Sequence, residues 1–155
     1  MIGMQETGFL TKWEPLHEQV YDRFRNPMYL YNIEFDGELK LTFGNEDNRY
    51  QFIYKRSEKF YYPIRMHRIL QEHIRSDIEE LIEQYVTDLK KKALPLPKYN
   101  NTFYKVKNSS FLAWFQSIDD SIPEFEVQAL EHHLYISDDY IIDVLAVVQP
   151  VIIKI

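Results

Sequence analysis

The sequence lacks several features on which common protein functions depend. It contains no cysteine, which excludes disulfides, thiolate nucleophiles and cysteine-ligated metal sites. Its four glycines are isolated, so no glycine-rich phosphate loop can form, and no Gly-x-Ser-x-Gly segment indicates a serine hydrolase. No apolar run approaches the roughly 18 residues of a membrane span, and the first residues do not resemble a signal peptide. We therefore expect a cytoplasmic protein that does not enter a membrane.

The composition is that of a globular chain with many aromatic residues. A chain of 155 residues is long enough to bury a substantial core, and we expect a single domain, 1–155. The 12 tyrosines and 10 phenylalanines favour β-sheet, where aromatic side chains pack on pleated, half-buried surfaces. Segment 93–101 contains proline and precedes a change in charge, which makes it the possible internal boundary.

Basic residues almost disappear after Asn108, where Lys154 is the only one. Such a one-sided charge favours a basic protein partner and repels the phosphates of nucleic acids. The run Lys90-Lys91-Lys92 is typical of a solvated helix end, so we do not expect nucleic-acid binding. The eight acids of this section are Asp119, Asp120, Glu124, Glu126, Glu131, Asp138, Asp139 and Asp143.

Residues 28–55 alternate apolar and polar side chains, which predicts three β-strands. A two-residue Asp36-Gly37 turn would put the apolar side chains on opposite faces, so we predict a three-residue loop, Phe35-Asp36-Gly37. A four-residue loop, Asn45–Asn48, then leads to the third strand. The result is a meander with one buried aromatic face. The predicted pairs on that face are Ile33 with Leu39, Tyr31 with Leu41, Tyr29 with Phe43, Phe43 with Tyr50, and Leu41 with Phe52.

The next segment has the apolar spacing of a long amphipathic helix. Pro63 can open it, apolar residues recur at three- and four-residue steps, and Pro95 forbids continuation. We expect this helix to cover the aromatic face of the meander. Ser76 can also cap a fresh helix, in which case the segment is two helices that meet near Arg75. A further short helix is expected at 16–24.

The C-terminal section is predicted as alternating strands and helices. We expect a strand at 102–107, a helix capped by Asn108 or Ser109 that continues through Phe115, and a strand at 132–136. Ser137-Asp138-Asp139 then caps a short helix, 140–146. The apolar segment 147–155 closes the chain as a strand that lies at an edge or begins after Pro150, because proline cannot donate a ladder hydrogen bond.

Two groups of residues invite a chemical interpretation. His132 and His133 suggest a metal, but neighbouring side chains of a strand point to opposite faces, so we predict no metal site and no cofactor. Asp139 and Asp143, one helical turn apart, form an acidic stripe, while Trp114 has the spacing of a core residue or, alternatively, of an exposed interface anchor. The candidate binding residues are Asp119, Asp120, Asp139, Asp143, Trp114 and His133, and none is assigned as catalytic.

Segments 108–115 and 133–145, followed by Pro150, resemble the C-terminal part of small uncharacterised bacterial cytosolic proteins. Some acidic proteins of this size act as immunity partners of toxins. The resemblance implies no catalytic residues and suggests a partner protein instead of a substrate.

Together these patterns predict an α+β fold in which an antiparallel β-meander packs against a long helix, followed by a C-terminal strand-helix-strand section. The function that we predict is a non-enzymatic protein-binding module, which as an immunity protein would mask a basic toxin. The alternative is a small enzyme or ligand-binding domain with a pocket of tyrosine, histidine and carboxylates. A deep pocket at His133, Asp138 or Asp143 would favour the alternative, and a flat acidic patch would favour protein binding. The sequence does not define the oligomeric state.

Overall fold

The computed structural model describes residues 5–17, 21–23, 25–96, 102–119 and 121–155. Within them the chain forms an α+β fold with two antiparallel sheets and three α-helices. The five-stranded sheet has the order β1 (Phe9–Lys12), β6 (Phe103–Lys107), β7 (Glu131–Ile136), β8 (Tyr140–Ala146) and β5 (Ile64–Gln71). The four-stranded sheet has the order β2 (Tyr29–Phe35), β3 (Leu39–Gly44), β4 (Arg49–Tyr54) and β9 (Val151–Lys154). The helices are α1 (Ser76–Lys91), α2 (Ser110–Ile118) and α3 (Glu124–Ala129), and a short 3-10 helix, η2 (Glu72–Ile74), precedes α1.

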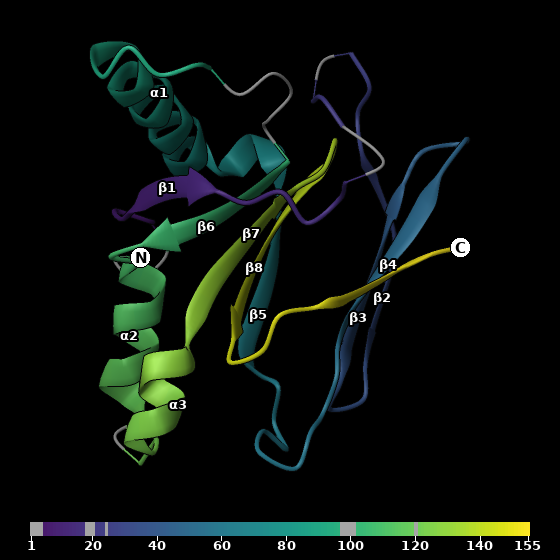
Figure 1. Ribbon diagram of the computed structural model, residues 1–155, viewed down its shortest axis with the longest axis vertical. Coiled ribbons are helices and arrows are strands. Elements are labelled where there is room, and N and C mark those ends of the chain that lie inside the picture. Colours follow the sequence, from purple (N-terminus) through teal and green to yellow (C-terminus); the bar gives the residue numbers. More distant parts are fainter. Residues whose placement is uncertain (1–4, 18–20, 24, 97–101, 120) are drawn as a thin grey trace.

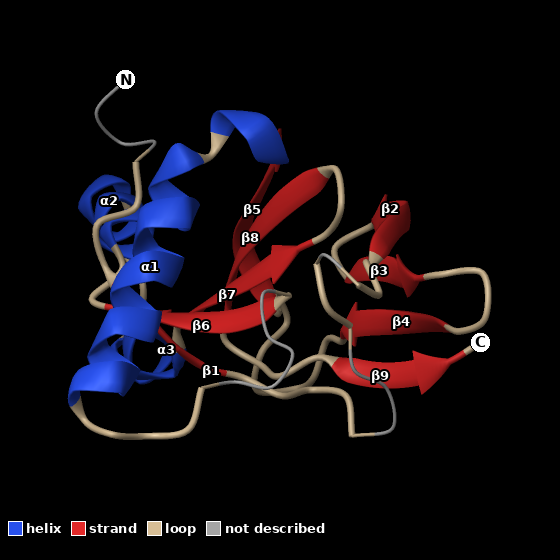
Figure 2. Cartoon of the chain, turned by 90° about the horizontal axis from the view of Figure 1, so that it is seen from above, coloured by secondary structure: helices blue, strands red, loops and turns tan. Residues whose placement is uncertain are grey.

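The elements form three layers, with the five-stranded sheet in the middle (Figures 1 and 2). One face of this sheet packs on the four-stranded sheet through a core rich in aromatic residues, and its other face is covered by the helices. Successive side chains of β7 and β8 therefore enter two different environments. The even-numbered residues of β8, such as Ile142, face the other sheet, whereas Leu134 and Ile141 face α1.

The aromatic face of the meander is confirmed for β3 and β4, but in β2 it is confirmed only for Ile33, which packs against this core. Phe43 pairs with Tyr50 and Leu41 pairs with Phe52, as predicted, and all four side chains are buried. In β2 the loop is Asp36-Gly37-Glu38, with Gly37 in the left-handed region at φ 99°, so Phe35 pairs with Leu39 and Ile33 with Leu41. A bulge between Leu30 and Asn32 then reverses the alternation, so Leu30 and not Tyr29 pairs with Phe43. Tyr29, Tyr31 and Phe35 are exposed.

The predicted long helix is wrong in its first half. Residues Ile64–Gln71 form β5, which pairs with β8, and α1 begins only at Ser76. The alternative start at Ser76 is thus confirmed, but a strand and not a second helix comes before it. The ladder with β8 overrides the helical spacing, since β-strands are stabilised by cross-strand pairs such as Ile69 with Ile142. Helix α1 covers the five-stranded sheet, and the meander is covered by that same sheet from its other side.

The C-terminal predictions are confirmed except for one element. Strands β6 and β7 and helix α2 form as expected, and the Ser109 hydroxyl caps α2 by accepting from the N–H of Leu112 at 3.0 Å. Residues 140–146 form strand β8 and not a helix, because they are buried on both faces and pair with two neighbours. Strand β9 begins after Pro150 and lies at an edge.

Two further predictions concern segments that are described in part. The short helix predicted at 16–24 includes residues 18–20 and 24, which lie outside the described residues, and residues 21–23 form no helix. The possible boundary at 93–101 also ends outside them, yet the five-stranded sheet contains strands from both sides of it, β1 and β5 before and β6 to β8 after. Among the described residues, no helix is long and apolar enough to cross a membrane.

Candidate functional site

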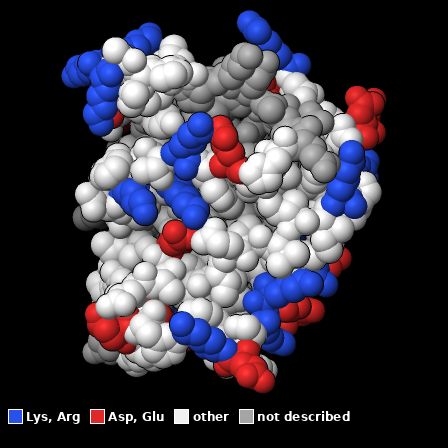
Figure 3. Space-filling model, in the orientation of Figure 1, with Lys and Arg blue, Asp and Glu red and all other residues white. Residues whose placement is uncertain are grey.

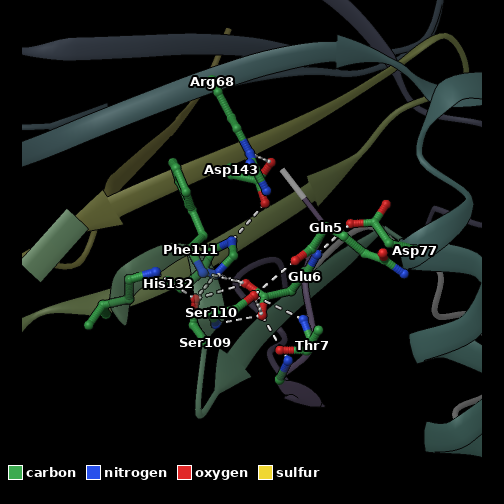
Figure 4. Close-up of polar contacts among 12 residues, drawn as sticks. Gln5, Glu6, Thr7, Arg68, Asp77, Ser109, Ser110, Phe111, His132 and Asp143 are labelled. Atoms are coloured by element: carbon green, nitrogen blue, oxygen red, sulfur yellow. Dashed lines mark hydrogen bonds and ion pairs between the residues drawn. The ribbon is translucent and has the colours of Figure 1, made fainter. Parts of the chain in front are cut away.

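A set of buried charges joins the N-terminal segment to the five-stranded sheet, to α1 and to α2 (Figure 4). These residues come from distant parts of the chain, and hydrogen bonds connect them into a closed circuit. Each charge has a partner of opposite sign, as buried ions require. The carboxylates are Glu6, Asp77 and Asp143, the cations are Arg68, Arg75 and His132, and Ser109 lies between Glu6 and His132.

The carboxylate of Glu6 is held at the N-terminus of α2. It accepts hydrogen bonds from the backbone N–H groups of Gly8 at 2.8 Å, Ser110 at 2.7 Å and Phe111 at 3.2 Å. It also accepts from the hydroxyl of Ser109 at 2.9 Å. The positive end of the helix dipole adds to these donors, so the site stabilises an anion that reaches it from more than a hundred residues away in the sequence.

His132 projects from β7 between two of the carboxylates. Its Nε2 lies 2.7 Å from Oδ1 of Asp143, and its Nδ1 lies 2.7 Å from the hydroxyl of Ser109 and 3.3 Å from Oε1 of Glu6. Burial lowers the pKa of this imidazole, but the hydrogen bonds to Asp143 and Glu6 outweigh burial and raise the pKa above its ordinary 6.5. For Glu6 the signs are reversed: burial raises the pKa of this carboxyl. The hydrogen bonds from His132 and from the backbone N–H groups outweigh burial and hold the pKa below its usual range. Because Asp143 can only accept at Nε2 and the Ser109 proton is donated to Glu6, both ring nitrogens of His132 donate, so the imidazole is protonated.

Arg75, just before α1, closes the circuit. Its Nε donates to Asp77 at 3.0 Å and its Nη1 to Asp143 at 2.6 Å, while the second oxygen of Asp77 accepts from the N–H of Glu6 at 2.9 Å. Arg68 of β5 also donates to Asp143, at 2.9 Å. Burial raises the pKa of Asp143, but the imidazolium and the two guanidiniums outweigh it and keep the pKa below its usual range. Asp143 is an anion on which three cations depend.

Ser109, His132 and Asp143 follow the order of a Ser-His-Asp relay, but the geometry does not activate a nucleophile. The hydroxyl of Ser109 donates to Glu6 and accepts from Leu112 and from His132, which uses its proton and both lone pairs. The imidazole is already protonated and cannot act as a general base. All three residues are buried. The circuit therefore fastens the N-terminal segment to α2 and to the sheet.

His133 points to the opposite face of β7, as the strand geometry predicts, and belongs to a separate chain of hydrogen bonds. Nε2 of His133 lies 3.1 Å from Glu131, a carboxylate that can only accept, so Nε2 donates. In the neutral ring Nδ1 then accepts from Tyr54 at 2.8 Å, which leaves the Tyr54 oxygen to accept from Tyr135 at 2.5 Å. The ring of Trp13 lies 4.7 Å away. Burial lowers the pKa of His133 and outweighs the attraction of Glu131, so this imidazole is neutral.

The predicted acidic stripe does not exist. Asp143 has no exposed surface and is fully paired, because residues 140–146 form a strand whose side chains at this position enter the core. Asp139 is exposed in the turn between β7 and β8. His133 is also completely buried, on the other face of the sheet. These three residues therefore share no surface on which a partner could bind.

Of the remaining predicted residues, Trp114 belongs to α2 and Asp119 follows it directly. Trp114 is 39% exposed and stacks on Phe111, with ring centroids 6.0 Å apart. Asp119 follows α2 and accepts two hydrogen bonds from Ser121, which, with Arg65 nearby, lower its pKa. Asp120 lies outside the described residues. Figure 3 shows acidic and basic side chains interspersed on this view of the molecule, with no continuous acidic surface.

A cluster of exposed aromatic and basic side chains, which the sequence interpretation missed, lies on the connection between β4 and β5. The exposed fractions are 60% for Tyr61, 57% for Tyr62 and 48% for Phe125, which approaches from α3. Tyr61 and Tyr62 meet edge to face at 4.9 Å, and Phe60 and Phe125 lie 5.9 Å apart. We call this cluster the 56–65 patch; its members are Arg56, Lys59, Phe60, Tyr61, Tyr62, Arg65 and Phe125.

Cations cover parts of these rings. The guanidinium of Arg56 lies 4.8 Å from the centre of the Tyr61 ring, and the ammonium of Lys59 lies 5.4 Å from that of Phe60. Arg65 lies 5.8 Å from the ring of Tyr62 and pairs with Glu126 of α3. The signal in the sequence is the run of three aromatics, 60–62, between Lys59 and Arg65, but the interpretation of this region uses only Pro63, as the start of a helix.

Comparisons of the chain with protein-family models, with curated proteins and with solved structures found no significant match. Within the described residues, no three histidine, aspartate or glutamate side chains are grouped as metal ligands.

Proposed function

We propose that this protein is a non-enzymatic protein-binding module that contacts its partner through the 56–65 patch. The observation that carries the proposal is that three aromatic side chains of this patch, Tyr61, Tyr62 and Phe125, are about half exposed beside cations. Tyrosine and arginine are enriched among the residues that dominate binding energy at interfaces. A cluster of such side chains on the surface of a soluble protein indicates an interaction site.

The anchoring of the patch supports the same function. Phe60 packs at the rim of the core cluster that contains Phe111 and Phe115, and Arg65 is fixed by its ion pair with Glu126. The exposed rings are thus presented from a supported loop, which reduces the entropy lost on binding. The buried Ser109-His132-Asp143 series, in contrast, has no free group with which to act on a substrate.

Neutralisation of a basic toxin is the more specific form of this proposal. It rests on the acidic C-terminal sequence, of which Glu126, Glu131 and Asp143 are already engaged in ion pairs within the chain. If the protein acts in this way, its partner should be a basic toxin whose bases meet acids outside the patch, since Arg56, Lys59 and Arg65 would repel them there, and adding the purified protein should abolish its toxicity.

A photo-crosslinking amino acid introduced at Tyr62 tests the proposed function. In the native cells it should capture one dominant protein, and the same amino acid at Tyr31, an exposed tyrosine of β2, should not. With the purified partner, Tyr61→Ala with Tyr62→Ala should weaken binding by about tenfold or more, as expected for central interface residues. The matched Tyr29→Ala with Tyr31→Ala variant should bind normally. Equal binding by the two variants would contradict the role of the patch.

A further inference from the structure

A groove of about 980 Å³ runs between β1 and α1, and it shares no residue with the 56–65 patch. In Figure 1 strand β1 runs directly beside α1. Residues Phe9, Leu10 and Thr11 form one wall of the groove. The other wall is one side of α1, from Glu80 to Lys92 at its C-terminal end.

The backbone of β1 borders this groove. Successive side chains of a strand point to opposite faces, so the three consecutive lining residues of β1 can only be reached along its edge. Strand β1 is the last strand of its sheet, and in the part of the chain that the structure describes nothing pairs with its outer side. Alternate N–H and C=O groups of such an edge are oriented to pair with an added strand.

The wall formed by α1 combines an apolar floor with two exposed acids, Glu80 and Glu83, on the part nearer its N-terminus, whereas its C-terminal end carries Lys91 and Lys92, of which Lys92 pairs with Asp88. Leu81 is buried, and Tyr85 and Leu89 are half-buried, so side chains from an added strand would contact apolar surface there. Glu80 and Glu83 are exposed on the rim, and neither forms an ion pair with another described residue. Unpaired acids beside apolar surface favour a ligand that carries both basic and apolar side chains.

We propose that this groove binds an extended segment of a partner protein in which basic and apolar residues alternate, and that the segment pairs with β1 as an additional strand. Four residues of β1 span about 13 Å, which matches a segment of four to six residues. A basic partner was expected from the sequence, but the acids that would attract it lie on α1 and not after Asn108. In strand addition, backbone hydrogen bonds provide affinity and the alternate side chains provide specificity.

A second copy of this chain fits the groove less well. Its own edge strand, β1, carries a single base, Lys12, which already pairs with Glu14 at 3.2 Å. Pairing two β1 strands around a two-fold axis would also bring the acidic rims of two α1 helices toward each other, and like charges at an interface are unfavourable. A partner segment with several bases meets neither difficulty.

A synthetic peptide that alternates lysine and valine, labelled with a fluorophore, tests the proposal with the full-length chain. We expect saturable binding by fluorescence anisotropy and amide chemical-shift changes at Phe9–Lys12. A peptide of the same sequence with every second amide N-methylated keeps the charge but cannot pair as a strand, and it should bind about tenfold more weakly or worse. A glutamate-valine peptide should not bind.

Matched variants of the protein separate the groove from general charge attraction. Glu80→Lys with Glu83→Lys should weaken binding of the lysine-valine peptide by about tenfold, because both rim charges are reversed. Glu46→Lys with Asp47→Lys changes the net charge equally at exposed positions of the β3–β4 loop and should bind normally.

Three results would overturn the proposal: equal binding of the N-methylated and unmodified peptides, equal effects of the two variants, or chemical-shift changes at β5 or β9 instead of β1. So would concentration-dependent dimers paired through β1. These results would not affect the proposed role of the 56–65 patch, because the crosslinking experiment at Tyr62 tests that surface separately.

Discussion

His132 and His133 are neighbours in the chain, are equally inaccessible to solvent and behave as opposites. His132 faces the helices and lies between the carboxylates of Glu6 and Asp143, which raise its pKa above 6.5. His133 faces the four-stranded sheet, where burial dominates and lowers its pKa despite one bond to Glu131. Burial alone therefore does not decide the charge of a histidine, because the number of carboxylates that reach its ring reverses the outcome.

The two faces of β7 also differ in what holds them together. On the His132 side, charged side chains from several segments of the chain pair with one another. Removing one of these side chains therefore leaves a buried charge without its partner of opposite sign. On the His133 side, stacked and edge-to-face aromatic rings surround a chain of hydrogen bonds among neutral Tyr135, Tyr54 and His133, which ends on the partly exposed carboxylate of Glu131. Substitutions on the first face should therefore be more damaging than polar substitutions on the second.

Asp143→Asn should have the largest effect. The asparagine amide would direct N–H groups toward Arg68 and Arg75 and would leave His132 and two guanidiniums with too little negative charge. Removing one partner from a buried charge cluster costs about 3–5 kcal/mol of unfolding free energy. Urea denaturation at neutral pH measures the loss.

Asp139→Asn is the matched control, since Asp139 lies in the same hairpin but is exposed. We expect it to unfold at nearly the native urea concentration. A variant Asp143→Asn that is unfolded while Asp139→Asn is folded supports the expectation too. Equal midpoints for the two variants would show that the charge circuit contributes little.

Tyr54→Phe should have the next largest effect and tests the His133 face. It removes the hydroxyl that donates to Nδ1 of His133 and accepts from Tyr135, and so leaves two buried polar groups unpaired. Such groups cost about 1–3 kcal/mol, which is measurable as a lower urea midpoint. Tyr61→Phe removes a hydroxyl from an exposed ring and should change the midpoint very little. If Tyr54→Phe is as stable as Tyr61→Phe, the hydrogen-bonded chain is not needed.

These two faces also show what could be predicted from the sequence. The alternation in β3 and β4 identified Leu41 and Phe52 as core residues, since period two permits only one common face. The same rule separated His132 from His133. The period-two rule failed at Tyr31, where a bulge reverses the alternation, because no residue type in β2 predicts a bulge.

Long-range pairing accounts for most of the remaining errors. Residues 64–71 and 140–146 have apolar spacing compatible with helices, but they pair with each other as β5 and β8, across 69 residues at Gln71 and Tyr140 and 82 at Ile64 and Ala146. Because β8 is buried on both faces, Asp143 occupies a core position that only the distant Arg68, Arg75 and His132 make tolerable. Glu6 could not be recognised for the same reason, since its partners lie at the start of α2.

The pH dependence of the two histidines should differ in sign. The raised pKa of His132 contributes stability that is fully present below pH 6.5 and is lost as pH rises through its folded-state value. The lowered pKa of His133 has the opposite effect on stability. Because the unfolded chain binds a proton at this histidine more readily than the folded protein does, the free energy of unfolding decreases as pH drops below 6.5. Each proton changes the free energy by at most about 1.4 kcal/mol per pH unit.

Proton NMR of the imidazole rings measures both pKa values directly. His132 should titrate above 6.5 and His133 below it. In Glu6→Gln the pKa of His132 should decrease while that of His133 stays the same, because only His132 contacts residue 6. Two histidines that titrate together would remove the distinction between the faces.

Glu131→Gln should have the smallest effect, although it alters the carboxylate that is bonded to His133. The hydrogen bond from His133 opposes burial and, with Gln149 and Lys105, lowers the pKa of Glu131 to about 2. The carboxyl is partly exposed to solvent, which screens its interactions, so we expect a loss of about 0–1 kcal/mol at neutral pH.

The effect of Glu131→Gln should depend on pH. Because the pKa of Glu131 is lower in the folded protein, its carboxylate stabilises the fold above the unfolded value of 4.5, and this contribution is lost as pH falls toward about 2. The native protein and Glu131→Gln should therefore differ slightly in urea midpoint at pH 7 and converge in acid. A difference at pH 7 as large as that of Asp143→Asn would mean that the His133 face depends on charge as strongly as the His132 face does.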